Sequence, residues 1–277
     1  MSAAVASSSS SARTSMRSRV LVSNERPSES TTVHTRILRC MLALDDSYAY
    51  WQRVEANVPI GQRARVAFEC RWFGTKSEAR IRTMMTDMVE RFDAYPEALA
   101  LLHEVGPLAP HLRPFVCHIH TQLADPIYRR FTGEFLPTRR DQGQSTIDRD
   151  VVARWIDTLE SGRWAANTCV KFASNLLATA ADVGFVVGKK EPRKLVVPPV
   201  PDWVLGYTLY LLRDVQIEGS LESNPYLRSL GIDPDGFRRL GARVPGVHIA
   251  ELGGVIDITW QEASLRAFGQ KYSGGNR

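Results

Sequence analysis

The stretch "WAANTCVKFASNLLATAADV", residues 164–183, runs directly into "GFVVGKKEPRKLVV", residues 184–197, and together they decide the fold of the second half of the chain. In the first stretch apolar residues recur every three or four positions, and Asn167, Lys171 and Ser174 fall on the opposite face. In the second, β-branched runs flank the basic loop "GKKEPRK". The pattern predicts an amphipathic helix followed by a β-hairpin.

A second helix precedes this pair, because "STIDRDVVARWIDTLES" begins with a capping residue and acidic residues and then repeats apolar residues at helical spacing. The turn "SGR" separates the two helices. Helix, tight turn, helix and hairpin follow one another in winged helix-turn-helix modules, so we predict a winged-helix-like module over 145–200. Residues 201–268 repeat the order in outline, with helices before "VHIAELGGVIDITW", a hairpin joined at Gly253-Gly254.

The N-terminal half reads as helical throughout. In "KSEARIRTMMTDMVERFDAY" apolar residues follow helical spacing, and no alternating strand pattern occurs between 35 and 140, so we expect a helical bundle there. The polar stretch 137–146 is the predicted domain boundary. Residues 1–34 read as a disordered leader, and whether they belong to the native protein stays open. The fold class is therefore mainly α.

Composition limits the function classes. The 277 residues carry 35 Lys and Arg against 30 Asp and Glu, a net charge of +5 that permits contact with nucleic acid without requiring it. Four cysteines without a CxxC pair favour a reducing cytoplasm. The longest apolar run, residues 203–212, is half the length of a bilayer span, so we expect a cytoplasmic protein without a membrane partner.

The predicted DNA contacts lie in the winged-helix-like module. The helix would present one group of donors to the groove or the backbone: Arg163, Asn167, Thr168 and Lys171. The wing would present another to phosphates: Lys189, Lys190, Arg193 and Lys194. The alternatives are a plain solvent-facing helix and a hairpin that its lysines keep soluble.

A possible second phosphate site comprises Arg238, Arg239 and Arg243 on the short helix before the last hairpin. Ion pairs with Asp233 and Asp235 are the alternative explanation for these arginines, and we favour it.

Enzyme motifs are absent from the sequence. It contains no GxxxxGK[ST], GxGxxG, GxSxG or HExxH pattern. His118 and His120 are donor types close together, but on a helix they point some 200° apart, so they do not share an ion. We therefore predict no catalytic residue, no metal and no cofactor.

The run "RWAANTCVKFASNLLATAADVGFVVG" resembles the BrxA family, the small helical components of BREX bacteriophage-defence systems. The likeness lies in Trp164, Thr168, Leu176-Leu177 and Gly184, and in a C-terminal strand similar to "GVIDITW". It implies a mostly helical protein whose first lobe is similar to the NusB fold and which binds double-stranded DNA beside other subunits of the defence system. The leader and the greater length depart from the family pattern.

These observations predict a non-catalytic protein that binds double-stranded DNA in prokaryotic phage defence. One alternative is a scaffold whose modules bind protein, favoured by the near balance of 8 basic and 9 acidic residues in 201–277. Another is a transcription regulator, which predicts a small-molecule pocket between residues 40 and 136.

Overall fold

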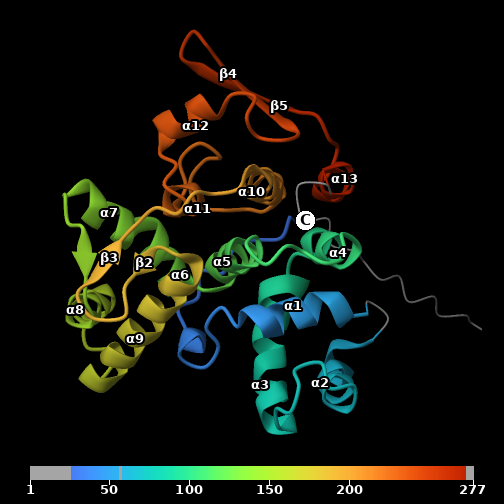
Figure 1. Cartoon of the computed structure of the whole chain (residues 1–277), viewed down its shortest axis with the longest axis vertical. Coiled ribbons are helices and arrows are strands. Elements are labelled where there is room, and N and C mark those ends of the chain that lie inside the picture. The colour runs from blue at the N-terminus through green and yellow to red at the C-terminus, as the bar shows by residue number, and fades with distance from the viewer. Residues whose placement is uncertain (1–25, 56–57, 273–277) are drawn as a thin grey trace, which may run out of the picture.

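Helices dominate the computed structural model, which describes residues 26–55 and 58–272 (Figure 1). The first part contains η1 (Arg36–Leu38), α1 (Leu44–Arg53), α2 (Ile60–Glu69), α3 (Glu78–Met88), the π-helical η2 (Val89–Asp93), α4 (Pro96–Glu104), α5 (Arg113–Ala124), α6 (Pro126–Arg130), the π-helical η3 (Phe131–Phe135) and α7 (Leu136–Asp141). The rest contains β1 (Thr146–Ile147), α8 (Arg149–Leu159), α9 (Ala166–Val183), β2 (Val186–Val187), β3 (Arg193–Leu195), α10 (Asp202–Asp214), α11 (Pro225–Ser229), α12 (Pro234–Leu240), β4 (Val247–Leu252), β5 (Val255–Trp260) and α13 (Leu265–Lys271). The mainly helical prediction is confirmed, with two small antiparallel sheets.

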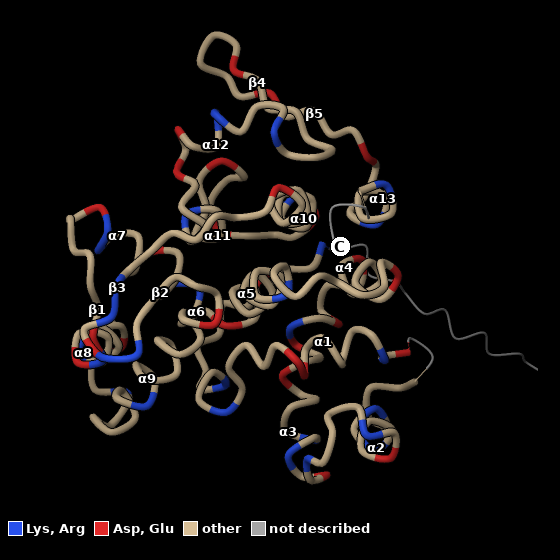
Figure 2. The backbone as a smooth tube through the Cα atoms, viewed as in Figure 1, with Lys and Arg blue, Asp and Glu red and all other residues tan. Residues whose placement is uncertain are grey.

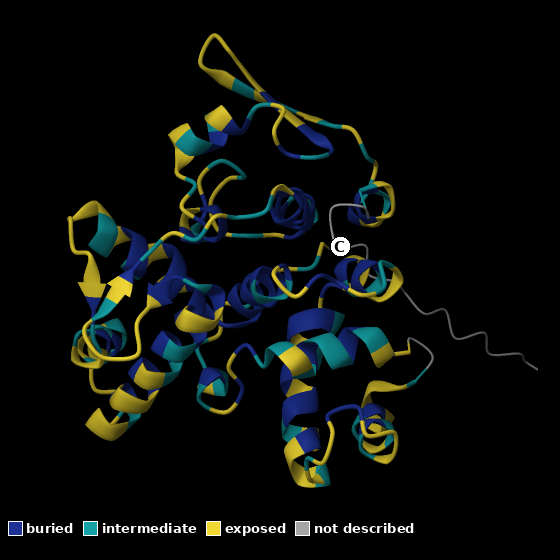
Figure 3. Cartoon of the chain, in the orientation of Figure 1, coloured by how far each residue is buried: buried dark blue, intermediate teal, exposed yellow. Residues whose placement is uncertain are grey.

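Helix α5 lies at the centre of the molecule. Every residue from Phe115 to Ala124 is buried, and α10 is buried from Trp203 to Leu212 (Figure 3). The elements α1, η2, α6, α9 and α10 all contact α5. One hydrophobic core runs from Ile37 to Phe268, so the three segments that we predicted as modules pack around the same interior.

Two buried histidines of α5 tie the surrounding elements to it. Ser229 Oγ donates to the Tyr226 carbonyl (2.6 Å), so it accepts from His118 Nε2 (2.8 Å), and His118 Nδ1 accepts from the Tyr128 hydroxyl (2.9 Å). His120 Nδ1 donates to the Arg91 carbonyl (2.6 Å), and its Nε2 accepts from the Tyr207 hydroxyl (2.7 Å).

Both histidine rings are neutral, because burial lowers the pKa of His118 to about 3 and that of His120 to about 4.

Residues 26–34 differ from the disordered leader that we expected; residues 1–25 of that prediction lie outside the described part. Glu29 is buried, forms an ion pair with Arg129 (3.5 Å) and accepts hydrogen bonds from the Tyr226 hydroxyl and from the Glu218 amide. Ser30 donates its amide to the Leu123 carbonyl (2.8 Å). A buried carboxylate is stable only when donors surround it, so the contacts of Glu29 hold residues 26–34 against the rest of the protein.

Two local predictions require correction. Half of the expected polar linker 137–146 is helical, because α7 continues the helical path of α6 and η3. The second strand of the basic hairpin is Arg193–Leu195 rather than Val196-Val197, so part of the basic charge lies on a strand instead of in a loop. The last hairpin is confirmed: Leu252 pairs with Val255 around Gly253-Gly254, and both glycines have positive φ.

Candidate nucleic-acid interface

The interface predicted from sequence lies on the unit β1-α8-α9-β2-β3, which forms one edge of the molecule (Figure 1). Helices α8 and α9 pack against each other, and the three strands form a sheet in the order β1-β3-β2. Asp148 caps α8 by accepting the Val151 amide (2.8 Å), whereas we had placed the cap at Ser145 or Thr146. Thr146 instead starts β1, a strand that sequence reading missed because two residues are too few for a periodic pattern.

Gly184 ends α9 and turns the chain into β2. Its φ of 91° lies in the left-handed region that favours glycine, and the Phe185 amide donates back to the Ala180 carbonyl (2.9 Å). This closure fixes where the hairpin starts relative to the end of α9.

The outer face of α9 carries Asn167, Lys171 and Ser174, all exposed as predicted. Ser174 Oγ donates to the Val170 carbonyl (2.9 Å), while no hydrogen bond or ion pair to a described residue holds the side chain of Asn167 or Lys171. Thr168 is half-buried and lies beside this face. Two of the predicted donors are therefore free to contact a ligand.

Arg163 is already engaged. Its guanidinium forms an ion pair with Glu160, donates to the Val33 carbonyl (3.2 Å) and lies 5.2 Å from the centre of the Trp164 ring. A phosphate would have to compete with all three contacts. Sequence reading did not foresee this, because Val33 lies 130 residues away along the chain.

The sheet places Arg193 and Lys194 on opposite faces. Lys194 pairs with Thr146 on one side and Val187 on the other, and all three are exposed. Arg193 pairs with the buried Ile147, and its Nε atom is buried without a hydrogen-bond partner among the described residues. Because neighbouring residues of a strand point to opposite faces, only Lys194 joins the solvent face of the wing.

Lys189 and Lys190 lie exposed in the loop between β2 and β3, and neither forms an ion pair within the described residues. Figure 2 shows basic positions along this hairpin. The two loop lysines therefore extend the free positive charge of the exposed wing face.

Charge compensation differs between the two successive segments 145–200 and 201–272. Between 145 and 200 only Arg163 has a carboxylate partner within 4.0 Å among the described residues. The basic residues of that unit without a described ion-pair partner are Arg149, Arg154, Lys171, Lys189, Lys190, Arg193 and Lys194. Between 201 and 272 every Lys and Arg is paired, namely Arg213, Arg228, Arg238, Arg239, Arg243, Arg266 and Lys271.

The possible second phosphate site is thus occupied by internal carboxylates. Arg238 pairs with Asp235 (2.7 Å), and it also lies 3.9 Å from a carboxylate oxygen of Glu251. The remaining pairs are Arg239 with Asp233 (3.9 Å) and Arg243 with Asp202 (2.7 Å). This agrees with the ion-pair explanation that we favoured for these arginines.

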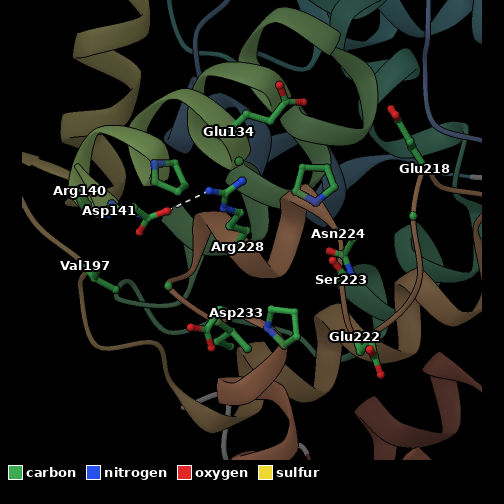
Figure 4. Close-up of a pocket in the computed structure, with 17 residues that line it drawn as sticks. Glu134, Arg140, Asp141, Val197, Glu218, Glu222, Ser223, Asn224, Arg228 and Asp233 are labelled. Atoms are coloured by element: carbon green, nitrogen blue, oxygen red, sulfur yellow. Dashed lines mark hydrogen bonds and ion pairs between the residues drawn. The ribbon is translucent and has the colours of Figure 1, made fainter. Parts of the chain in front are cut away.

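A groove of about 800 Å³ lies where α7, the chain around Val197 and the segment 218–234 meet (Figure 4). Its lining includes two arginines, Arg140 and Arg228, and carboxylates at Glu134, Asp141, Glu218, Glu222 and Asp233. The groove is therefore unsuited to phosphate. It also lies almost entirely outside residues 40–136, where the regulator alternative predicted a ligand pocket.

Arg140 connects this groove to the wing. It lines the groove and donates to the Val196 carbonyl (3.3 Å) just beyond β3, and burial lowers its pKa. Its neighbour Arg139 donates to the Thr146 carbonyl of β1 (3.0 Å). These two arginines of the predicted polar boundary 137–146 therefore hold β1 and the end of β3 in position.

No protein-family model matches the chain, and no curated protein matches its sequence. Within residues 26–55 and 58–272, every helix is too short or too polar to cross a bilayer.

Proposed function

We propose that the protein binds double-stranded DNA through the unit 146–195, without catalysis, as a cytoplasmic component of a prokaryotic BREX-type phage-defence system. The observation that carries the DNA-binding part is that seven of the eight Lys and Arg residues of this unit have no ion-pair partner among the described residues, whereas every one between 201 and 272 has such a partner. Cations that a protein does not neutralise itself are available to the phosphate backbone. The defence-system part rests on the resemblance of residues 163–188 to the BrxA family.

The topology supports a winged-helix interpretation. Strand, helix, helix, strand and strand, with the sheet order β1-β3-β2, is the arrangement of winged helix-turn-helix modules. In our proposal α9 enters the major groove with Asn167 and Lys171 foremost, since amide and ammonium groups donate to base edges and phosphates. Lys189, Lys190 and Lys194 contact the backbone alongside. A NusB-like N-terminal lobe remains part of the proposal.

A mobility-shift titration on random-sequence duplex at several salt concentrations tests the proposal. Reversing charge at Lys189, Lys190 and Lys194 should weaken binding and flatten its salt dependence, because each lost phosphate contact lowers the slope of log K against log salt by about 0.9. The same reversal at Arg239 and Arg243, which are internally paired, is the matched control and should change the slope little. An unchanged titration with the wing variant would remove the wing from the proposal.

A scaffold role is the second candidate, favoured by the complete pairing of basic residues between 201 and 272. Such a surface offers no free cation to DNA but leaves apolar and acidic groups for a protein partner. Recovery of a partner subunit at high salt, with no retention of duplex at low salt, would favour this role over DNA binding.

A further inference from the structure

The β4–β5 hairpin ends in an apolar tip that projects from the body (Figure 1). Leu252 is 83% exposed and Val255 is 68% exposed, the two highest values among the large apolar residues described as exposed. They face each other across the last rung of the ladder. At its base the hairpin is anchored, because Val247 and Ile249 are buried. The anchored ladder therefore holds two adjacent aliphatic side chains in water, where contact with another surface would bury them.

A recess of about 460 Å³ lies at the end of α10, with apolar walls from Leu212, Val215, Ile217 and Leu221. Arg26 and Arg213 stand at its edge. Arg26 is exposed and has no ion-pair partner among the described residues, whereas Arg213 already pairs with Asp214 (2.9 Å). The recess therefore combines polar and apolar lining, with Ile217 and Leu221 as its accessible apolar side chains and Arg26 as a cation without a described ion-pair partner.

The hairpin tip and the recess have complementary charge. The segment 247–262 contains Glu251, Asp257 and Glu262 and no lysine or arginine. Glu262 pairs with Lys271, and Glu251 has only the distant contact with Arg238 (3.9 Å). A tip that carries two apolar side chains beside a carboxylate thus matches a recess that offers Ile217 and Leu221 beside an arginine.

The tip does not reach the recess of its own chain. Trp260, on the first rung of the ladder, lies over Arg213 at a distance of 4.9 Å from ring centre to guanidinium carbon. Val255 is five residues farther along β5, about 17 Å away at the usual rise per residue. The ladder therefore carries the tip away from the recess, and only another molecule can supply the contact.

We propose that the hairpin tip of one molecule inserts Leu252 and Val255 into the α10 recess of a second copy, with Glu251 near Arg26. The contact is head to tail, because it joins two different surfaces of the same chain. A hairpin tip buries less than the roughly 1,200–2,000 Å² of a stable interface, so the association is weak and depends on concentration.

Sedimentation equilibrium of the full chain over a concentration series tests this proposal. The weight-average mass of the wild type should rise with concentration. It should stay at the monomer value for a tip variant, Leu252→Asp with Val255→Asp, and should rise less steeply for a recess variant, Arg26→Glu. Thr259→Asp, on the exposed outer face of the hairpin, is the matched control and should associate like the wild type.

A mixing experiment is more specific. A second recess variant, Leu221→Asp, replaces one of the two accessible apolar side chains of the recess with a charge. The tip variant keeps an intact recess and Leu221→Asp keeps an intact tip, so each alone is monomeric while an equimolar mixture forms a dimer and nothing larger. Circular dichroism checks that each variant is folded. A monomeric wild type at every concentration, self-association of the tip variant, or a mixture that stays monomeric would each overturn the proposal, and the last two would point to a different surface.

Discussion

The opposite faces of Arg193 and Lys194 lead to a sharp prediction about the wing. Both residues lie on β3, and sequence alone treats them as equivalent phosphate contacts. Lys194 stands on the exposed face between Thr146 and Val187, whereas Arg193 lies on the side of the buried Ile147. Lys194→Gln should therefore weaken DNA binding, and Arg193→Gln should leave it nearly unchanged.

The magnitude follows from counterion release. One phosphate contact contributes about 0.9 to the slope of log K against log salt concentration. If this contribution is taken as zero at 1 M salt, losing the contact lowers the affinity for DNA by about 15-fold at 50 mM salt and by about 4-fold at 200 mM salt. In free energy this is about 1.6 and about 0.9 kcal/mol. The gap between the two variants should thus narrow as salt rises.

Fluorescence anisotropy with a labelled random-sequence duplex measures both variants over this salt range. Lys194→Arg keeps the charge and serves as the control, with a slope equal to that of the wild type. Equal losses for Arg193→Gln and Lys194→Gln would refute the argument from strand alternation. A Lys194→Gln slope equal to that of the wild type would show that this face of the wing does not contact DNA.

Three further predictions concern stability and are measured by urea unfolding. Unfolded histidines bind protons below a pH of about 6.5, whereas His118 and His120 stay neutral in the fold until the pH approaches their lowered pKa values of about 3 and about 4, so stability falls as pH decreases through this window. Between pH 7.5 and pH 5 each of the two histidines should lower the free energy of unfolding by about 2 kcal/mol. In His118→Gln the decrease over this pH range should therefore be smaller by about 2 kcal/mol. Equal decreases in the variant and the wild type would contradict a buried neutral His118 ring. Gly133→Ala should destabilise by about 1–3 kcal/mol, because the added Cβ would lie 2.4 Å from the Pro225 carbonyl oxygen, while Gly61→Ala, with open space around it, should be neutral or stabilising; the reverse order would exclude close packing of η3 on α11. Glu29→Ala should cost about 3 kcal/mol, since it leaves Arg129 buried without its carboxylate, and a loss below about 0.5 kcal/mol would mean that residues 26–34 are not needed for packing.

Local patterns predicted much of the second half of the chain. The helix 166–183 follows from the spacing of its apolar residues, and its outward face of Asn167, Lys171 and Ser174 is where periodicity placed it. The hairpin at Gly253-Gly254 follows from alternation and a turn that requires positive φ. Both features depend on residues that are close together in the sequence, so the sequence pattern is enough to predict them.

What the tertiary structure alone decided are the contacts between distant residues. The sequence by itself determined that the chain is mainly helical, that a basic hairpin follows α9, and which residues are charged. Which of those charges remain free depended on Val33 reaching Arg163, on β1 fixing the register of β3, and on carboxylates meeting Arg238, Arg239 and Arg243. The physical reason is that an ion pair forms only when its two groups lie within about 4 Å of each other, and residues far apart in the sequence come that close only in the folded chain.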